Sequence, residues 1–385
     1  EDLKKAGACF GVSGGYERPM WFALNGEKPE YNYSYKYQNW FPAAEFETKN
    51  CSENVGLFDL TPFSKFEIKG DTAHDELQLI CTANIKNEIG KCVYTQMLNN
   101  DGGIETDLTV VCLGKNHFRI ISSAATRERD KFHIKKNISD NVFFKDVTED
   151  YCVFGLFGPK SRELIKKISK DDLSNESFKF GTSKNIVIKG IKVWAQRLSY
   201  VGELGFELYV ETKNAKEIYS EIVKEGTNHK LSHCGMHAMN IMRMESGFLH
   251  WGHDISPEEN QIQAGLMHAV SFKKNVNFIG KDSLIKAKNH KLIKQFIMVS
   301  LKKSKPGEPL LLHDEPIYLN DKIIGRTTSG NYSFNFNKNL SFGYINSGLK
   351  KEDIVNKNLY IEIEKIKYPA KLELKSLKNK NIKLS

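Results

Sequence analysis

The stretch NNDGGIETDLTV, Asn99–Val110, indicates how the central part of this chain folds. Asp101–Gly103 is a strong hairpin signal, because Asp-Gly and Gly-Gly pairs adopt the backbone angles that tight two-stranded turns require. The residues after this turn alternate between apolar and polar side chains, which predicts a half-buried strand. Asp107 lies on that returning strand, and its carboxylate is therefore a candidate for a rigidly placed functional group.

A second segment, RLSYVGELGFELYV at Arg197–Val210, repeats the same combination of glycines and an acidic residue. Gly202 and Gly205 flank Glu203, and apolar side chains then alternate along a predicted strand. Two carboxylates held on hairpins suit a ligand with paired N–H donors, such as an aminopyrimidine ring. For either segment alone, the simpler interpretation is an acidic residue in a solvated turn. Their joint occurrence in this order favours a binding site.

The length of 385 residues predicts two or three domains with substantial cores. Residues 1–49 are rich in turns and aromatic side chains and are expected to form a lead-in or docking segment. Residues 50–287 alternate short strands with helices, among them helices expected over HDELQLICTANI and SRELIKKI. The order occurs twice, which suggests two related α+β halves. Residues 288–385 read as strands separated by Gly, Pro, Asn and Asp turns, which predicts a small all-β domain.

Composition excludes several classes of protein. Hydrophobic residues make up 40% of the chain, so it is expected to be globular, and no apolar run approaches the ~20 residues of a membrane span. The net charge of +9 comes from dispersed lysines without an arginine-rich aromatic block, which argues against nucleic acid as a partner. The seven cysteines form no C-x-x-C pair, a pattern that favours reduced thiols over structural zinc.

A third segment, GMHAMNIMRMESGFLHWGHD at Gly235–Asp254, predicts a methionine-rich helix followed by a polar turn. Arg243 on this helix either extends from a core position towards solvent or holds an anionic group in its planar fork. His250, His253 and Asp254 raise the possibility of a metal site, which the lack of a clear further ligand disfavours. No G-x-G-x-x-G occurs in a βαβ setting, which argues against a dinucleotide site.

Several motifs together resemble one known family. In chain order they are LFDLTPFSKFEIKG, TQMLNNDGGIETDLTV, FGPKS, RLSYVGELGFELYV, RMESGFLHWGHDISPEENQIQAGL and NFIGKDSL. This order is similar to that of the aminomethyltransferase (glycine-cleavage T-protein) family. The lead-in GACFGVSGGYERPMWFA and the stretch HWGHDISPEE most resemble the C-terminal half of dimethylglycine and sarcosine dehydrogenases. IGRTTSG and LSFGYIN resemble the C-terminal β-barrel of the family.

The resemblance implies an α+β, tetrahydrofolate-binding fold of two related subdomains around a central cleft, with a C-terminal all-β barrel. It also implies a set of functional residues. These are the essential carboxylate Asp107 near N10 of the folate, the pterin-binding Glu203, the pterin contact Tyr94, the anchor Arg243 for the glutamate tail, and Tyr200 and Trp251 as further cofactor contacts. Many relatives carry a second Asp where this chain has Thr106, which leaves Asp107 as the sole carboxylate of that pair.

The function implied is transfer of the methyl-derived carbon of dimethylglycine, sarcosine or a similar N-methyl amine, delivered as an iminium or formaldehyde, to give 5,10-methylenetetrahydrofolate. In the related dehydrogenases FAD belongs to an N-terminal domain, so the resemblance implies a flavin in a missing domain or partner subunit. The chain opens with EDLKK, without a signal-peptide pattern or an initiator Met, which suggests a piece of a longer protein in the cytoplasm or mitochondrial matrix.

Three other functions remain open. The first is glycine-cleavage aminomethyltransferase, which needs a lipoyl carrier protein. The second is a methyltransferase that acts alone and yields 5-methyltetrahydrofolate. The third is a non-catalytic folate-storage or assembly module.

Overall fold

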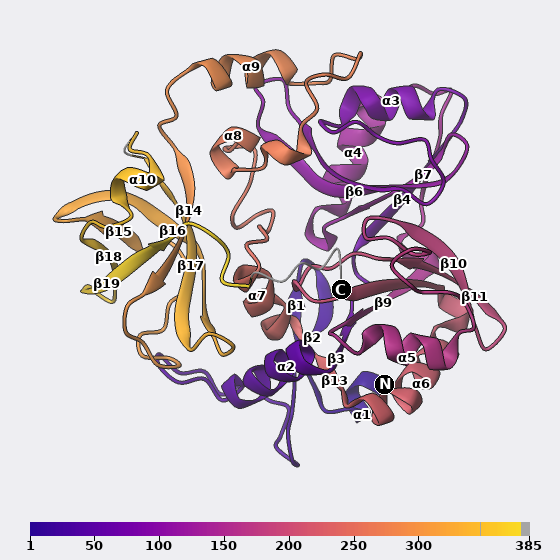
Figure 1. Cartoon of the computed structure of the whole chain (residues 1–385), viewed down its shortest axis with the longest axis horizontal. Helices are drawn as coiled ribbons and strands as arrows, with labels where there is room; N and C mark the ends of the chain where they lie inside the picture. The colour runs from indigo at the N-terminus through magenta and orange to yellow at the C-terminus, as the bar shows by residue number, and fades with distance from the viewer. Residues whose placement is uncertain (347, 379–385) are drawn as a thin grey trace.

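The computed structural model describes residues 1–346 and 348–378, which form two large β-sheets with flanking helices, a two-stranded N-terminal sheet and a separate β-barrel (Figure 1). The barrel lies to one side of the two sheets, and helix α7 (Met236–Glu245) lies between them in this view. The mixed α and β content and the closed barrel confirm the fold class expected from the sequence.

The first sheet is antiparallel and carries Asp107. Its strands, in spatial order, are β5 (Cys92–Leu98), β6 (Ile104–Gly114), β7 (His117–Ser122), β4 (Ser64–Lys69) and β8 (Phe143–Asp146). Leu108 and Val110 of β6 pack in a core that includes residues of helices α3 (Ala73–Ile80) and α4 (Arg127–Asn137). Because side chains alternate along a strand, Asp107, Thr109 and Val111 lie on the opposite face.

The second sheet has six strands. In spatial order they are β10 (Ser183–Ile188), β11 (Ile191–Gln196), β12 (Gly205–Glu211), β9 (Tyr151–Phe157), β3 (Val55–Asp59) and β13 (Leu231–Cys234). Phe206 and Leu208 of β12 share a core with residues of helices α5 (Ser161–Ile168) and α6 (Ala215–Gly226). Tyr209, on the other face of β12, shares a core with Val111 of the first sheet. The faces of β6 and β12 opposite these helices therefore point towards one another, and residues of α7 share the core between them.

The N-terminal segment is part of the folded body. It comprises helix α1 (Asp2–Lys5), the hairpin of β1 (Ala8–Ser13) and β2 (Tyr16–Phe22), and helix α2 (Phe41–Glu53). Trp21 is 1% exposed, whereas Tyr33 and Tyr35 are 77% and 87% exposed. The aromatic lead-in expected over residues 1–49 thus combines a partly buried hairpin with an exposed tyrosine loop, and α2 continues to residue 53.

The C-terminal part contains short helices and the closed barrel. The helices are α8 (Gln261–Ala264), α9 (Lys281–Asn289) and α10 (Lys351–Ile354). The barrel strands are β14 (Gln295–Leu301), β15 (Pro316–Leu319), β16 (Lys322–Ser333), β17 (Lys338–Ile345), β18 (Leu359–Ile363) and β19 (Ile366–Glu373). Among the described helices, none is long and apolar enough to cross a membrane.

Candidate functional site

Asp107 and Tyr94 lie together on the face of the first sheet that points towards the second. β5 and β6 are antiparallel, with Gln96 opposite Asp107 and Tyr94 opposite Thr109. Gln96 Nε2 donates a hydrogen bond to Asp107 Oδ1 at 2.8 Å, and the Tyr94 hydroxyl donates to the same carboxylate. The Tyr94 ring remains 37% exposed and stacks on His268 with a centroid distance of 6.1 Å. The pairing of β5 with β6 therefore fixes the positions of Asp107, Gln96 and Tyr94, and Tyr94 remains accessible to solvent.

The environment of Asp107 favours its protonated form. Burial raises the pKa of Asp107 to about 6, although the hydrogen bonds from Gln96 and Tyr94 lower it. The charge of Asp130 raises the pKa of Asp107 further. A carboxylate with a pKa near 6 can take up and release a proton near neutral pH, as a general acid or base must.

Asp130 of α4 is a second buried carboxylate that the sequence interpretation did not identify. Its oxygens accept hydrogen bonds from the hydroxyls of Thr106 at 3.0 Å, and of Ser122 and Thr126 at 2.6 Å each. Burial raises the pKa of Asp130 to about 6. Thr106 thus links the strand of Asp107 to this carboxylate.

Tyr200 and Trp251 lie near the same end of β6. The Tyr200 hydroxyl donates to the Leu249 carbonyl at 2.9 Å, and burial raises its pKa, with a smaller contribution from Asp107. Trp251 Nε1 donates at 3.0 Å to the carbonyl of Ile104, the first residue of β6. Both aromatic residues are thereby held in the surroundings of Asp107.

Glu203 does not join this group. It lies in the loop of residues 197–204 between β11 and β12, and its carboxylate forms a buried ion pair with Lys378 Nζ at 2.6 Å. Lys378 Nζ also donates to the carbonyl of Val201 at 3.2 Å. The loop turns at Gly202, whose φ of +70° is readily adopted only by glycine. The C-terminal segment thus engages the carboxylate that the sequence assigned to the pterin.

A different carboxylate, Glu207, occupies the face of β12 that points towards the first sheet. It lies opposite Gln196 of β11 and accepts a hydrogen bond from the Tyr209 hydroxyl at 2.9 Å. Burial raises the pKa of Glu207 to about 7. Its charge also contributes to the raised pKa of Cys92, two residues before Tyr94 on the same face of β5. Glu207 and the Tyr94 strand therefore share the space between the sheets.

Gln196 adds to this polar face. Its side-chain oxygen and nitrogen are both buried, and neither has a hydrogen-bond partner among residues 1–346 and 348–378. A buried amide without partners carries a free-energy cost of ~1–3 kcal/mol for each unmatched group, which a polar ligand offsets. The alternation FELYV provides the sequence signal for this site, since Glu207 must face away from Phe206 and Leu208.

Arg243 is committed to interactions within the protein. Its Nη1 donates to Asp254 Oδ2 at 2.5 Å and to the Phe248 carbonyl at 3.1 Å, while Nη2 donates to Ser329 at 2.8 Å. Nε donates to Asn240 at 2.8 Å. In this arrangement Arg243 joins α7 to the barrel strand β16, and all three of its guanidinium nitrogens have partners within the protein.

Asp254, paired in this way, is not available to His250 and His253 as a metal ligand. The two imidazole rings are 4.9 Å apart between centroids. Over the described part of the chain, no group of three or more His, Cys, Asp or Glu side chains is placed to hold a metal ion.

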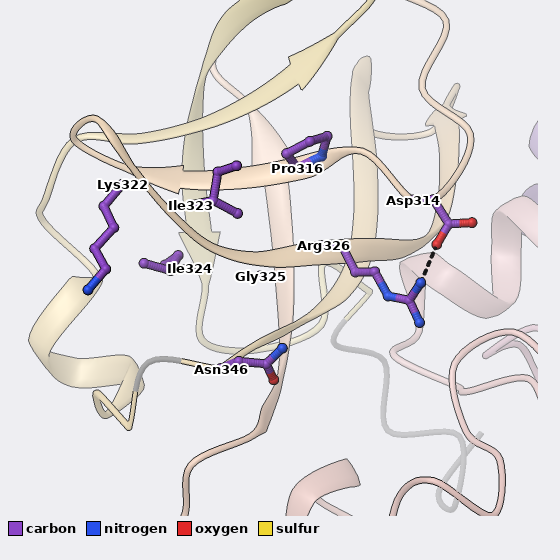
Figure 2. A pocket seen from close by; sticks show the side chains of 8 residues that line it. All are labelled: Asp314, Pro316, Lys322, Ile323, Ile324, Gly325, Arg326 and Asn346. Atoms are coloured by element: carbon purple, nitrogen blue, oxygen red, sulfur yellow. Dashed lines mark hydrogen bonds and ion pairs between the residues drawn. The ribbon is translucent and has the colours of Figure 1, made fainter.

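A separate pocket of about 530 Å³ lies on the barrel. Figure 2 shows its lining side chains from β15, β16 and the loops beside them, with Arg326 paired to Asp314 at 3.0 Å. It shares no lining residue with the group around Asp107. Its exposed, charged rim gives no indication of a catalytic function.

Comparison with known families identifies the class of this chain. Residues 1–274 match the GCVT N-terminal domain, and residues 294–377 match the glycine cleavage T-protein C-terminal barrel domain. The glycine cleavage aminomethyltransferase T of Bartonella henselae has the same fold, with a TM-score of 0.84 at 19% identity over 98% of this chain and 97% of its own. The chain belongs to the folate-dependent aminomethyltransferase (glycine-cleavage T-protein) family.

Two kinds of curated relative bear on the function of this chain. The aminomethyltransferase of Halothermothrix orenii is 32% identical over 78% of this chain and 82% of its own. The 4-methylaminobutanoate oxidase (formaldehyde-forming) of Paenarthrobacter nicotinovorans is 35% identical over 96% of this chain, and human mitochondrial dimethylglycine dehydrogenase is 32% identical over 94%. The chain spans only 44% and 41% of the length of these last two relatives.

Proposed function

We propose that this chain transfers a one-carbon unit to tetrahydrofolate and acts as the folate module of a flavin-dependent demethylating enzyme. The observation that carries the proposal is the placement of Asp107, a carboxylate with a pKa of about 6, between two sheets whose facing sides carry polar side chains. Family membership supports folate as the carbon acceptor. The donor we propose is an N-methyl amino acid, oxidised by a flavin-containing domain or partner.

The polar residues of the second sheet fit the pterin end of folate. A pterin presents its N3–H and 2-amino group side by side, and a carboxylate accepts such a pair in a bidentate, charge-assisted arrangement. Glu207 is available for this contact because its only hydrogen bond within the described ranges comes from Tyr209. The unpartnered amide of Gln196 lies opposite it. We therefore propose Glu207, with Gln196, for the role that the sequence predicted for Glu203.

Asp107 and Tyr94 would serve the reacting end. Bound tetrahydrofolate supplies nucleophilic nitrogens that accept the carbon. Asp107, ionised above pH ~6, stabilises positive charge that develops at the neighbouring nitrogen and can take up its proton. Gln96 and the Tyr94 hydroxyl hold the carboxylate in one orientation, so little reorganisation is needed when charge develops.

The proposed donor class comes from the relatives. Their names specify 4-methylaminobutanoate, dimethylglycine and sarcosine, all of which join a methylated amine to a carboxylate. Since this chain spans less than half of each of those proteins, the oxidation step is assigned to a flavin-containing domain or partner outside these 385 residues.

The test uses the chain with formaldehyde and tetrahydrofolate. We expect calorimetric titration to show tetrahydrofolate binding, and the chain to accelerate formation of 5,10-methylenetetrahydrofolate over the spontaneous condensation. Mass spectrometry of the product separates this function from a methyltransferase that acts alone, for which an N-methyl donor would give 5-methyltetrahydrofolate. Binding without acceleration from any donor would point to a storage module, and absence of binding would overturn the proposal.

A further inference from the structure

Arg18 of the hairpin strand β2 is a buried cation for which the described part of the chain supplies no hydrogen-bond partner. Its side chain is only 5% exposed, and its Nε and Nη2 atoms are buried and unpartnered among the described residues. The other buried arginines in the same ranges each donate at least one hydrogen bond: Arg119 to Glu67, Arg197 to the Phe178 carbonyl and Arg243 to Asp254. Burying a charge without a partner is costly, so Arg18 requires an explanation.

None of the acidic residues that the structure describes forms an ion pair with Arg18. Asp59 at the end of β3 is close enough to influence the pKa of Arg18, which burial lowers. The Asp59 carboxylate instead accepts the backbone N–H of Thr61 at 3.0 Å, and it forms no ion pair with Arg18. Gly11, opposite Arg18 in β1, contributes no side chain. The guanidinium therefore keeps two adjacent donors for an external acceptor.

The hairpin places Arg18 at the same end of the first sheet as Asp107. At its tip, Gly14 packs so closely on Ala125 that an added Cβ would lie 3.1 Å from the Ala125 nitrogen. Tyr16 Oη accepts a hydrogen bond from Arg127 Nη1 at 3.0 Å. The segment contacted follows β7, whose last residue lies opposite Leu108, the neighbour of Asp107. The hairpin is thus attached at the end of β7, beyond which residues 104–107 of β6 have no partner in β7.

A second connection leads from Arg18 to the same region. The charge of Arg18 contributes to the lowered pKa of His250. His250 follows Leu249, whose carbonyl holds the Tyr200 hydroxyl, and Tyr200 in turn lies within electrostatic range of Asp107. Two independent paths, through the hairpin tip and through residues 249–250, therefore connect Arg18 to the surroundings of Asp107.

We propose that Arg18 binds the carboxylate of a ligand of the one-carbon site, an inference that rests on the proposed function. A guanidinium with two free donors is matched by a carboxylate, which accepts two parallel hydrogen bonds. Arg243 cannot take this role without releasing Asp254. Two ligands of the proposed reaction bear carboxylates, namely the iminium formed from the N-methyl amino acid donor and the glutamyl tail of folate. The amine itself keeps the same carboxylate and serves as a stable probe for the iminium. Recognition by Arg18 selects such ligands over amines without an acid group.

The experiment compares wild type with Arg18→Met, which removes the buried charge while nearly keeping the side-chain length. We expect the variant to fold with an unchanged or higher melting temperature, because no ion pair is lost. To test the donor, calorimetry would compare the binding of sarcosine with that of dimethylamine, which lacks the carboxylate. To test the folate tail, it would compare tetrahydrofolate with its analogue without the glutamyl group. Arg326→Met, on the barrel surface, is the control and should bind every ligand as wild type does.

If Arg18 holds the donor, Arg18→Met should lose about tenfold to a hundredfold in sarcosine affinity and keep its tetrahydrofolate affinity, since a hydrogen bond to a charged group contributes on that scale. If it holds the tail, the loss should fall on tetrahydrofolate and vanish for the analogue without the glutamyl group. Unchanged binding of all carboxylate ligands would overturn the proposal. Failure of wild type to bind tetrahydrofolate, with sarcosine binding still dependent on Arg18, would overturn the folate function alone.

Discussion

The ion pair of Glu203 and Lys378 allows the two candidate pterin carboxylates to be separated by mutation. Lys378→Met removes the ammonium and leaves the buried Glu203 carboxylate without its cation. Glu203→Gln together with Lys378→Met removes both charges while keeping both side-chain volumes. Glu207→Gln changes the carboxylate that faces the first sheet, where it has no cation partner among the described residues.

The expected magnitudes follow from burial. Removing one partner of a buried ion pair costs ~3–5 kcal/mol, whereas replacing both partners by uncharged side chains of similar volume is often neutral. We therefore expect about 3 kcal/mol of destabilisation for Lys378→Met alone. This variant also loses the hydrogen bond from Lys378 Nζ to the Val201 carbonyl. The double variant should recover most of this loss. Urea denaturation of Glu203→Gln, of Lys378→Met and of the double variant measures the coupling between Glu203 and Lys378 directly.

Calorimetric titration with tetrahydrofolate then assigns the roles. We expect the double variant to bind within about threefold of wild type, since both of its substitutions lie in the contact between the loop and the C-terminal segment. Glu207→Gln should bind about tenfold to a hundredfold more weakly, because a charge-assisted pair of hydrogen bonds is lost. Loss of binding in the folded double variant, together with intact binding in Glu207→Gln, would refute the structural assignment and restore Glu203.

Three further predictions concern the surroundings of Asp107 and the Glu203 loop. The rate of carbon transfer should rise with pH, with a midpoint at about pH 6, as Asp107 ionises. Tyr94→Phe should move this midpoint upward, because it removes a hydrogen bond to the ionised carboxylate. A pH profile unchanged by Tyr94→Phe would contradict this prediction. Burial raises the pKa of Asp130 to about 6 in the folded chain, so the stability that protonated Asp130 contributes is lost as pH rises from ~4 to 6. Asp130→Asn should therefore reduce the difference in unfolding free energy between pH 4.5 and pH 8 by about 2 kcal/mol in urea titrations. An unchanged difference would contradict this prediction. Gly202→Ala should destabilise by ~1–3 kcal/mol in thermal unfolding, because its φ is +70° and the new Cβ would lie 2.0 Å from Ser246 Oγ; a neutral result would show that the loop can shift.

Much of the fold follows from local patterns. The helix predicted over SRELIKKI is α5, Ser161–Ile168, because its apolar residues repeat at helical spacing. The helix predicted over HDELQLICTANI ends earlier, at Ile80. Cys81 instead pairs with Met97 of β5, and the backbone N–H of Thr82 donates to the Gln96 carbonyl. Such long-range backbone pairing has no local signal in the sequence.

The site was predicted less completely, because contacts between distant residues decide which side chain faces it. Glu203 and Glu207 are four residues apart in one motif, but only Glu207 lies on a strand, where alternation fixes its face. The partner of Glu203 is 175 residues further along the chain, and the sequence gives no sign of it. Asp107 and Tyr94, which the sequence placed in one site, lie close together in the structure, because the hairpin pairing of β5 with β6 sets their register.

The central claim is that Asp107 acts in carbon transfer and is not required for folate binding. The most direct measurement compares wild type with Asp107→Asn, using calorimetry for tetrahydrofolate affinity and mass spectrometry for 5,10-methylenetetrahydrofolate formed from formaldehyde. We predict that Asp107→Asn binds tetrahydrofolate within a few-fold of wild type and loses at least ~100-fold in accelerated product formation. Product formation at the wild-type rate by the folded variant would contradict the account.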